Sequence, residues 1–337
     1  MQAYLFDKLP DKTVACKLCH HRCVIKNGKR GICQVRQNTD GLLVSLVYGK
    51  VVARNVDPIE KKPLFHFYPG SLSYSIATVG CNFKCRFCQN ADIAQMPKDH
   101  QGAVIGQGTT PDEIVAAAKA HNCRSIAYTY TEPTVYFEFA HDTARLAHEQ
   151  GVLNLFVTNG YMTSEALDMM DPYLDAANVD LKAFSDEFYR TYCGAGLAGV
   201  KETLVSMKSR GIFLEVTTLL IPGLNDNPEE LADLAEFIAS ALGTDTPWHI
   251  SRFHPTYKLT DRSATPVQTL MTAHKIGLRA GLKYVYTGNV PGEESEKTFC
   301  HACGKVLIDR WGFNVSNYAI IDGKCKFCGA VIDGVGM

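Results

Sequence analysis

The side chains best suited to chemistry in this sequence are its 13 cysteines, because eleven of them are grouped. Thiolates two or three residues apart can bind one metal centre without straining the backbone. A disulfide framework is typical of short secreted chains, whereas this chain has 337 residues and an odd number of cysteines. The spacing therefore favours metal ligation at three places. The groups are Cys16, Cys19, Cys23 and Cys33; Cys81, Cys85 and Cys88; and Cys300, Cys303, Cys325 and Cys328.

The central group has the pattern C-x3-C-x2-C and lies directly after a predicted strand. A tetrahedral structural zinc site or an ordinary 4Fe-4S site takes four protein ligands. Cys81, Cys85 and Cys88 supply three, and no fourth cysteine is near them in the sequence. The pattern therefore indicates a metal centre with one coordination position open to a small molecule.

The C-terminal group consists of two C-x2-C pairs, each followed by glycine and separated by 21 residues. This pattern predicts a four-cysteine ribbon that Cys300, Cys303, Cys325 and Cys328 close around zinc or rubredoxin-like iron. We expect residues 290–337 to form a separate module whose small core depends on the metal. The alternative role for this module is to dock a partner protein.

The N-terminal group has the pattern C-x2-C-x3-C-x9-C within a segment of short β-like runs. Its four cysteines, Cys16, Cys19, Cys23 and Cys33, can close a structural zinc site or bind an auxiliary iron-sulfur cluster. His20 or His21 can substitute for one of these ligands. We expect residues 1–70 to form an N-terminal cysteine-rich metal-binding domain.

Between residues 71 and 289, short β-branched runs alternate with longer segments of helical period, which indicates repeated βα units around a parallel sheet. Six such units favour an α/β fold of the partial TIM-like (β/α)6 barrel type over a doubly wound sheet. The predicted strands are 74–79, 125–130, 154–158, 178–181, 213–220 and 248–253. The predicted helices are 110–120, 135–149, 164–170, 200–210, 228–241 and 265–280.

Polar residues follow several of these strands, where a βα barrel would direct them to the pocket that carries its chemistry. Besides the central cysteines after the first strand, the candidates are Glu132, Thr158, Asn159, Asp180, Lys182 and His254. Glu132 can alternatively cap a helix, and a single histidine such as His254 is often only packed. We expect the six residues to line one pocket.

The central pattern, read as CNFKCRFCQN after the first strand of a βα barrel, resembles the radical S-adenosylmethionine (SAM) enzymes. The resemblance implies that Cys81, Cys85 and Cys88 bind three irons of a 4Fe-4S cluster whose fourth iron binds SAM. Reductive cleavage of SAM then gives a 5′-deoxyadenosyl radical that abstracts hydrogen from a substrate. In the same way, Glu132 in TYTEPT corresponds to a residue that holds the SAM ammonium, although this sequence lacks the Gly-Gly-Glu form of that motif. Lys182 corresponds to a holder of the SAM carboxylate.

The N-terminal cysteine pattern, together with TYTEPT, TNG, DLKAF, IPGLND and RFHP, narrows this resemblance. The sequence resembles the AmmeMemoRadiSam system radical SAM enzymes, which are related to pyruvate formate-lyase activating enzymes. This resemblance implies companion proteins of the Memo and AMMECR types. It also implies an electron donor of flavodoxin or ferredoxin type.

The overall composition gives no sign of a polyelectrolyte or membrane partner. There are 34 basic and 35 acidic residues, a formal net charge of −1, so no global field attracts nucleic acid. No apolar run reaches the roughly 18 to 20 residues that span a bilayer, and residues 1–13 lack the pattern of a signal peptide. We therefore expect a cytoplasmic protein.

Three functions remain in competition at this level. The first is a radical SAM enzyme that abstracts hydrogen from an unidentified substrate. The second is a glycyl-radical enzyme activase that acts on a glycine of a partner protein. The third is a metal-stabilised binding protein without catalysis, which would use all its cysteines structurally and bind neither iron nor SAM.

Overall fold

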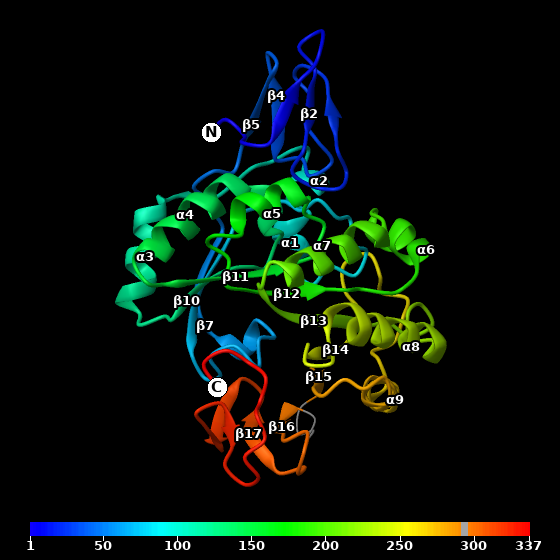
Figure 1. Cartoon of the computed structure of the whole chain (residues 1–337). Helices are drawn as coiled ribbons and strands as arrows, with labels where there is room; N and C mark the ends of the chain where they lie inside the picture. The colour runs from blue at the N-terminus through cyan, green and yellow to red at the C-terminus, as the bar shows by residue number, and fades with distance from the viewer. Residues whose placement is uncertain (291–295) are drawn as a thin grey trace.

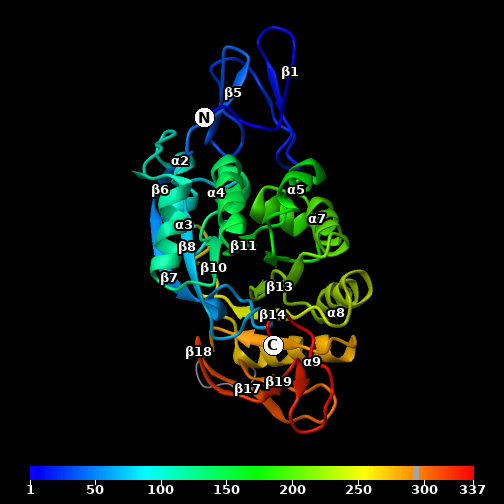
Figure 2. The same cartoon turned by 60° about the vertical axis from the view of Figure 1, so that its left-hand side comes forward.

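The computed structural model describes residues 1–290 and 296–337. A small β-rich part, a central α/β part and a second small β-rich part follow one another along the chain (Figure 1). The two small parts lie at opposite ends of the central one (Figure 2). The boundary expected at residue 290 adjoins residues 291–295, which lie outside the described residues.

The central part is built on an eight-stranded sheet in which seven strands are parallel and one edge strand is antiparallel. Its inner strands are short and largely buried, as parallel strands covered on both faces must be. In spatial order they are β15 (Val285–Gly288), β14 (Trp248–Arg252), β13 (Phe213–Leu220), β12 (Ala176–Asp180), β11 (Leu153–Thr158), β10 (Ser125–Tyr128), β8 (Leu72–Ala77) and the antiparallel β7 (Ala53–Pro58).

All six predicted strands are present, as β8 and β10 to β14, so the prediction of a mostly parallel α/β sheet is confirmed. β15 is a seventh parallel strand that the sequence pattern did not reveal. β7 comes from the segment expected in the N-terminal domain, yet it pairs with β8 over six residues. Among the described residues, β7 and β15 each pair with one neighbour, so the sheet is open at these two edges.

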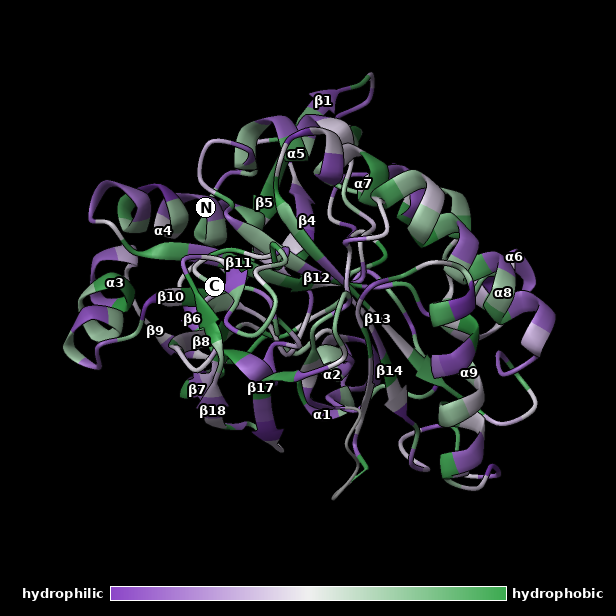
Figure 3. Cartoon of the chain, turned by 60° about the horizontal axis from the view of Figure 1, so that its bottom comes forward, coloured by the Kyte–Doolittle hydropathy of each residue, from purple (hydrophilic) through white to green (hydrophobic). Residues whose placement is uncertain are grey.

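Helices connect the parallel strands and form an arc around the sheet (Figure 3). α3 begins where the Thr110 hydroxyl accepts a hydrogen bond from the backbone N–H of Glu113, whose carboxylate accepts one from the Thr110 N–H. No helix in the described ranges is long and apolar enough to cross a bilayer. The helices are α1 (Ala91–Ala94), α2 (Met96–Asp99), α3 (Pro111–Ala120), α4 (Phe137–Glu149), α5 (Ser164–Met170), α6 (Asp186–Phe188), α7 (Leu197–Ser209), α8 (Pro228–Phe237) and α9 (Val267–Arg279).

The N-terminal part packs on the helices α4 and α5. Arg36 donates two hydrogen bonds to Glu138, with N···O distances of 2.9 and 2.7 Å, and both side chains are buried. Arg22 makes a second two-fold ion pair with Glu165 at 2.8 Å. These pairs fix the N-terminal part to the central one. Its strands are β1 (Phe6–Lys8), β2 (Val14–Cys16), β3 (Val24–Ile25), β4 (Arg36–Thr39), β5 (Leu42–Ser45) and β6 (Lys50–Val51), the last pairing with β9 (Gln107–Gly108).

The C-terminal part packs against Phe65, Tyr284 and Tyr286 of the central part. Residues near 335 also return to the segment after β7. The Nδ1 atom of His66 lies 2.6 Å from the backbone oxygen of Asp333, and Val335 forms a β-bridge with Phe67. The strands of this part are β16 (Thr298–Phe299), β17 (Val306–Trp311), β18 (Asn314–Tyr318), β19 (Ile320–Ile321) and β20 (Lys324–Cys325).

Candidate active site and metal centres

The central cysteine loop leaves β8 through a glycine that cannot be replaced without strain. Gly80 has φ +105°, a conformation that residues with a Cβ rarely adopt. A Cβ at this position would lie 2.7 Å from Cγ1 of Val35, in the N-terminal part. The start of the loop is therefore in direct contact with the segment that carries Cys33.

Hydrogen bonds from several elements hold the loop in place. The Nζ atom of Lys98, in α2, donates to the backbone oxygens of Cys81 at 2.7 Å and Phe83 at 2.5 Å. The backbone N–H of Phe83 donates to Sγ of Cys81 at 3.3 Å, the kind of bond that stabilises a thiolate. The sequence analysis did not identify Lys98, because its role depends on the position of α2.

The three thiols of the loop suit a cluster better than a single ion. Cys85 is buried, and Cys81 and Cys88 are partly exposed. Burial raises the pKa of Cys81 and brings that of Cys88 to about 11, so bound iron is needed to keep them as thiolates. Within residues 1–290 and 296–337, their sulfurs do not form a set within 4.8 Å of one another. They therefore lack the close spacing of ligands to a single ion, which a 4Fe-4S cluster does not require because each cysteine binds a different iron.

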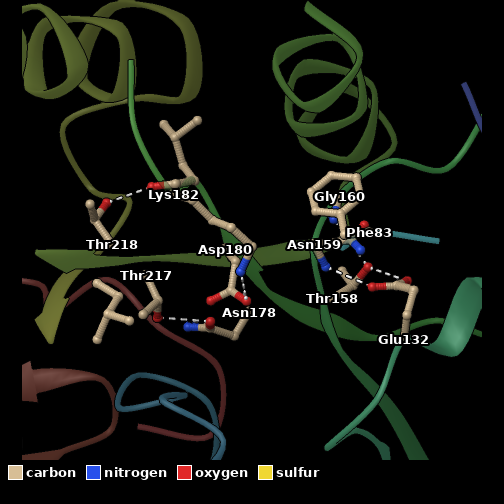
Figure 4. A network of polar contacts seen from close by, with 12 residues as sticks. Phe83, Glu132, Thr158, Asn159, Gly160, Asn178, Asp180, Lys182, Thr217 and Thr218 are labelled. Carbon is tan, nitrogen blue, oxygen red and sulfur yellow. Dashed lines mark hydrogen bonds and ion pairs between the residues drawn. The ribbon is translucent and has the colours of Figure 1, made fainter. Parts of the chain in front are cut away.

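Glu132 connects the carboxyl ends of β10 and β11 and is 2% exposed. Its Oε1 atom accepts hydrogen bonds from the hydroxyls of Thr134 at 2.5 Å and Thr158 at 2.8 Å. Its Oε2 atom accepts one from the backbone N–H of Asn159 at 2.8 Å (Figure 4). Burial raises the pKa of Glu132, and these donors oppose that shift. The helix-cap alternative also holds, since Oε1 accepts from the backbone N–H of Thr134.

Asn159 links this carboxylate to the cysteine loop. Its Nδ2 atom donates to Oδ1 of Asn82 at 2.7 Å and lies 3.7 Å from Sγ of Cys81. Glu132, Asn159, Asn82 and Cys81 therefore form one continuous polar chain. The sequence predicted Glu132, Thr158 and Asn159 at neighbouring strand ends, and the structure brings them together beside the first cysteine.

Asp180 and Lys182 lie at the end of the next strand, β12, apart from the group around Glu132 (Figure 4). The Nζ atom of Lys182 donates to Asp180 at 2.8 Å. Burial would lower the pKa of Lys182, but Asp180 and the thiol of Cys85 outweigh this and raise it. A permanently charged amine therefore lies close to Cys85. Cys193, which belongs to none of the three cysteine groups, is buried close to Cys85 and raises the pKa of the Cys85 thiol.

His254 lies apart from this group, on the wall of a cavity of about 890 Å³. Gln89, the residue after Cys88, lines the same cavity and places it next to the cysteine loop. Trp311 and Phe313, at the tip of the β17–β18 hairpin, line it from the C-terminal part. This large cavity is the space next to the loop in which a substrate can bind.

The sequence analysis missed a buried carboxylate and histidine pair in this region. Glu215, on β13, lies 2.5 Å from Nε2 of His249, on β14, and both side chains are buried. His249 lines the large cavity, and its ring stacks on that of Tyr286. Glu215, the one charged residue of the strand β13, was the signal that could have identified the pair.

The four C-terminal cysteines meet as predicted. Their sulfur atoms lie within 4.8 Å of one another, with Cys300 3.6 Å from Cys328 and Cys303 3.8 Å from Cys325. Four thiolates around one zinc ion at about 2.3 Å lie about 3.8 Å apart, which matches this geometry. The site fits a single tetrahedral metal ion.

The four N-terminal cysteines line one cavity, which also has Arg36 and Asn82 in its wall. In the described part of the chain, they do not form a set of three or more sulfurs within 4.8 Å, unlike the C-terminal group. His21 is held elsewhere, with Nε2 2.9 Å from the backbone oxygen of Asn82. His20 contacts Tyr161 and Thr203 instead.

Comparison with known proteins identifies a family profile and several relatives that match this chain. The profile of the "Radical SAM superfamily" matches residues 75–238, which include the central cysteines and the strand ends described above. The chain is 47% identical to "Uncharacterized protein MJ0808" of Methanocaldococcus jannaschii over 334 residues, 98% of each chain. It is 24% identical to the pyruvate formate-lyase-activating enzyme of Clostridium pasteurianum over 55% of this chain and 81% of that one.

A solved structure shares the fold. The crystal structure of Streptococcus suis SuiB bound to S-adenosylmethionine superimposes with a TM-score of 0.51 at 13% identity. The match covers 68% of this chain and 53% of SuiB. At this identity the comparison concerns the fold alone.

Proposed function

Since this chain belongs to the radical SAM superfamily and is related to pyruvate formate-lyase activating enzymes, we propose that it abstracts hydrogen from a substrate bound beside the central loop. Cys81, Cys85 and Cys88 would hold a 4Fe-4S cluster. When bound, this cluster and SAM supply a 5′-deoxyadenosyl radical by one-electron reduction. The chain's own residues then have to bind SAM, orient it and keep water away from the radical.

The single observation that carries this proposal is the position of the three thiols between two polar groups. Glu132 and Asn159 lie on the Cys81 side, and the pair of Asp180 and Lys182 lies on the Cys85 side. The SAM amino acid end carries an ammonium and a carboxylate. We assign the ammonium to Glu132, whose Oε2 accepts from the backbone N–H of Asn159 and, as a carboxylate oxygen, can accept a second hydrogen bond, and we assign the carboxylate to Lys182.

The other predicted residues have supporting roles in this proposal. Thr158 and the backbone of Asn159 hold the Glu132 carboxylate in place, and Asp180 holds the Lys182 amine. His254 lies on the cavity wall and is assigned to the substrate or to the nucleoside half of SAM. Because Glu132 and Lys182 are fixed before SAM binds, little conformational entropy is lost on binding.

The test is SAM cleavage by protein purified and reconstituted without oxygen. We expect 5′-deoxyadenosine to form on addition of SAM and dithionite, and each of Cys81→Ala, Cys85→Ala and Cys88→Ala to abolish it. Cys123→Ala is the matched control, because Cys123 is buried but lies outside the three groups. Cleavage that survives in any of the three loop variants would overturn the proposal.

A glycyl-radical activase is the second candidate, favoured by the activating enzyme of Clostridium pasteurianum among the relatives. That match covers 55% of this chain, so the parts outside it have no counterpart in the comparison. An activase would leave a stable glycyl radical on a partner. Its electron paramagnetic resonance doublet in co-purified protein would support this candidate, and SAM cleavage on a small molecule without it would exclude it.

We propose further that the chain belongs to the AmmeMemoRadiSam branch, and the remaining proposals rest on that membership. We assign zinc to the C-terminal four-cysteine site. We also assign the protein to the cytoplasm, where its thiols stay reduced. We also assign Memo-type and AMMECR-type companions and a flavodoxin- or ferredoxin-like electron donor. Co-purification of the companions with the tagged protein from its native host tests the partnership, and their absence from the eluate would count against it.

A further inference from the structure

We propose that Cys16, Cys19, Cys23 and Cys33 hold a redox-active iron-sulfur cluster that passes electrons to the central loop. The inference that these cysteines hold a cluster rather than a single ion rests on the geometry of the N-terminal part alone. Its role as an electron relay rests on the proposed function, because only a radical SAM enzyme needs electrons at the central loop.

The spacing of the sulfur atoms separates a cluster from a single ion. Four thiolates around a single zinc ion lie about 3.8 Å from one another. The C-terminal sulfurs have this spacing, with distances of 3.6 and 3.8 Å. The N-terminal sulfurs surround one cavity but, in the described ranges, no three of them lie within 4.8 Å of one another. The central sulfurs likewise form no such set in the described ranges. Neither the N-terminal nor the central group therefore has the close spacing of ligands to a single ion.

The wall of the cavity also holds buried N–H groups that lack an acceptor. Among the described residues, Arg36 Nε and Asn82 Nδ2 find no hydrogen-bond partner, and the two side chains are 2% and 1% exposed. The other nitrogens of Arg36 are used by Glu138. An unpaired buried donor costs about 1 to 3 kcal/mol, so an acceptor is expected at this place. The sulfurs of a thiolate-bound cluster are negatively charged acceptors.

The cavity adjoins the central loop through one residue. Asn82 lines the cavity, and its Oδ1 atom lies 3.8 Å from Sγ of Cys81. The contact of Gly80 with Val35 brings the same two segments together a second time. A cluster held by the N-terminal cysteines would therefore be separated from the central one by a single side chain.

On the other side, the cavity borders a surface groove of about 690 Å³. Gly31 and Ile32 line both spaces and separate them. The groove carries four basic side chains and one acidic one, and its electrostatic field favours a protein with an acidic surface. The charged residues are Arg30, Lys84, Lys98, Lys258 and Asp99.

This arrangement defines a path for one electron. An acidic carrier such as a reduced flavodoxin would dock in the groove and be oxidised as it gives one electron to the cluster held by the N-terminal cysteines. That cluster would be oxidised in turn as it reduces the one held by the central cysteines. No atom and no proton moves between the two centres.

The first experiment tests the cluster without any enzymatic activity. A variant with Cys81, Cys85 and Cys88 all changed to Ala is purified anaerobically, and its iron, sulfide and zinc are measured. We expect about four irons and four sulfides, with one zinc at the C-terminal site. Adding Cys16→Ser and Cys23→Ser should remove the iron but leave that zinc, and an unchanged circular dichroism spectrum should show that the protein is still folded. Two zinc ions and no iron in the triple variant would overturn the cluster.

The second experiment tests the relay. In the chain with an intact central loop, Cys16→Ser and Cys23→Ser should abolish 5′-deoxyadenosine formation with reduced flavodoxin but preserve it with dithionite. Lys258→Glu should raise the KM for flavodoxin, whereas Lys275→Glu, on the exposed face of α9, should not. Equal loss with both reductants would overturn the relay. If the unaltered protein cleaves SAM with neither reductant, the proposed function fails. The iron content of the triple variant still decides whether the N-terminal cysteines hold a cluster.

Discussion

The contact between Gly80 and Val35 provides the sharpest test of how the N-terminal part and the central loop are joined. In Gly80→Ala the new Cβ would lie 2.7 Å from Cγ1 and 3.2 Å from Cγ2 of Val35. The residue would also have to keep φ near +105°. The substitution therefore combines backbone strain with a steric clash between two segments far apart in sequence.

The two effects can be estimated separately. A left-handed conformation costs a residue with a Cβ about 1 to 2 kcal/mol. Overpacking of a well-filled core costs about 1 to 3 kcal/mol more. We therefore expect Gly80→Ala to lower the free energy of unfolding by about 2 to 5 kcal/mol. Val35→Ala alone, which removes two methyl groups, should cost about 2 kcal/mol.

A double-mutant cycle isolates the clash. With Val35→Ala present, the Cβ at position 80 no longer meets a methyl group, so the double variant should be about 1 to 3 kcal/mol more stable than the sum of the single effects. The measurement is urea unfolding, followed both by circular dichroism and by the fluorescence of Trp248, which is fully buried. Coincident transitions would justify the two-state treatment. Additive effects, within about 0.5 kcal/mol, would refute the contact.

Three further predictions concern other parts of the molecule. Arg36→Met should lower the free energy of unfolding by about 3 to 5 kcal/mol, because it leaves the Glu138 carboxylate buried without its ion-pair partner. The double variant Arg36→Met with Glu138→Leu should recover much of the lost stability. Urea unfolding measures both variants, and a double variant as unstable as Arg36→Met would contradict the prediction. Burial lowers the pKa of His66 to about 4 in the folded state, against 6.5 for the unfolded chain, so the unfolded state binds the proton first and stability falls as pH falls from about 6.5 to 4. The loss is at most about 3 kcal/mol and should be absent in His66→Gln, when urea unfolding at pH 7.5 and pH 5 is compared; an unchanged pH dependence in that variant would show that another group is responsible. Removal of the C-terminal metal by a chelator should release one ion per chain and abolish amide exchange protection in β16 to β20, but not in β10 to β13; protection that persists would mean that the C-terminal part folds without metal.

The sequence was sufficient to predict those elements whose signals lie within a short stretch of the chain. The capping box of Thr110 and Glu113 marked the start of α3, and the alternation of apolar strands with helical segments placed β8 and β10 to β14. Because the carboxyl ends of parallel strands meet at one edge, Glu132, Thr158 and Asn159 could be grouped before their contacts were known. The four C-terminal cysteines could be grouped because each C-x2-C pair followed by glycine forms a local metal-binding turn.

The remaining features depend on contacts between distant segments. β7 is an ordinary β-like run, and nothing in its residues indicates that its partner is β8 rather than a strand of the N-terminal part. The spacing of Cys16 and Cys33 along the chain does not determine the distance between their sulfurs. The pair of Glu215 and His249 arises only because β13 and β14 are neighbours in the sheet.

The contacts between residues 66–68 and 333–335 have a consequence for how this protein is made. His66 and Asp333 are 267 positions apart. At about 5 to 20 residues per second, a ribosome needs on the order of 10 to 50 s to deliver the second after the first. During that time the apolar side chain of Phe65, which packs in the finished protein with Tyr284, Tyr286 and residues of the C-terminal part, has no permanent packing partner there. The nascent chain should therefore depend on chaperones in this interval, and a slower rate of translation would extend it.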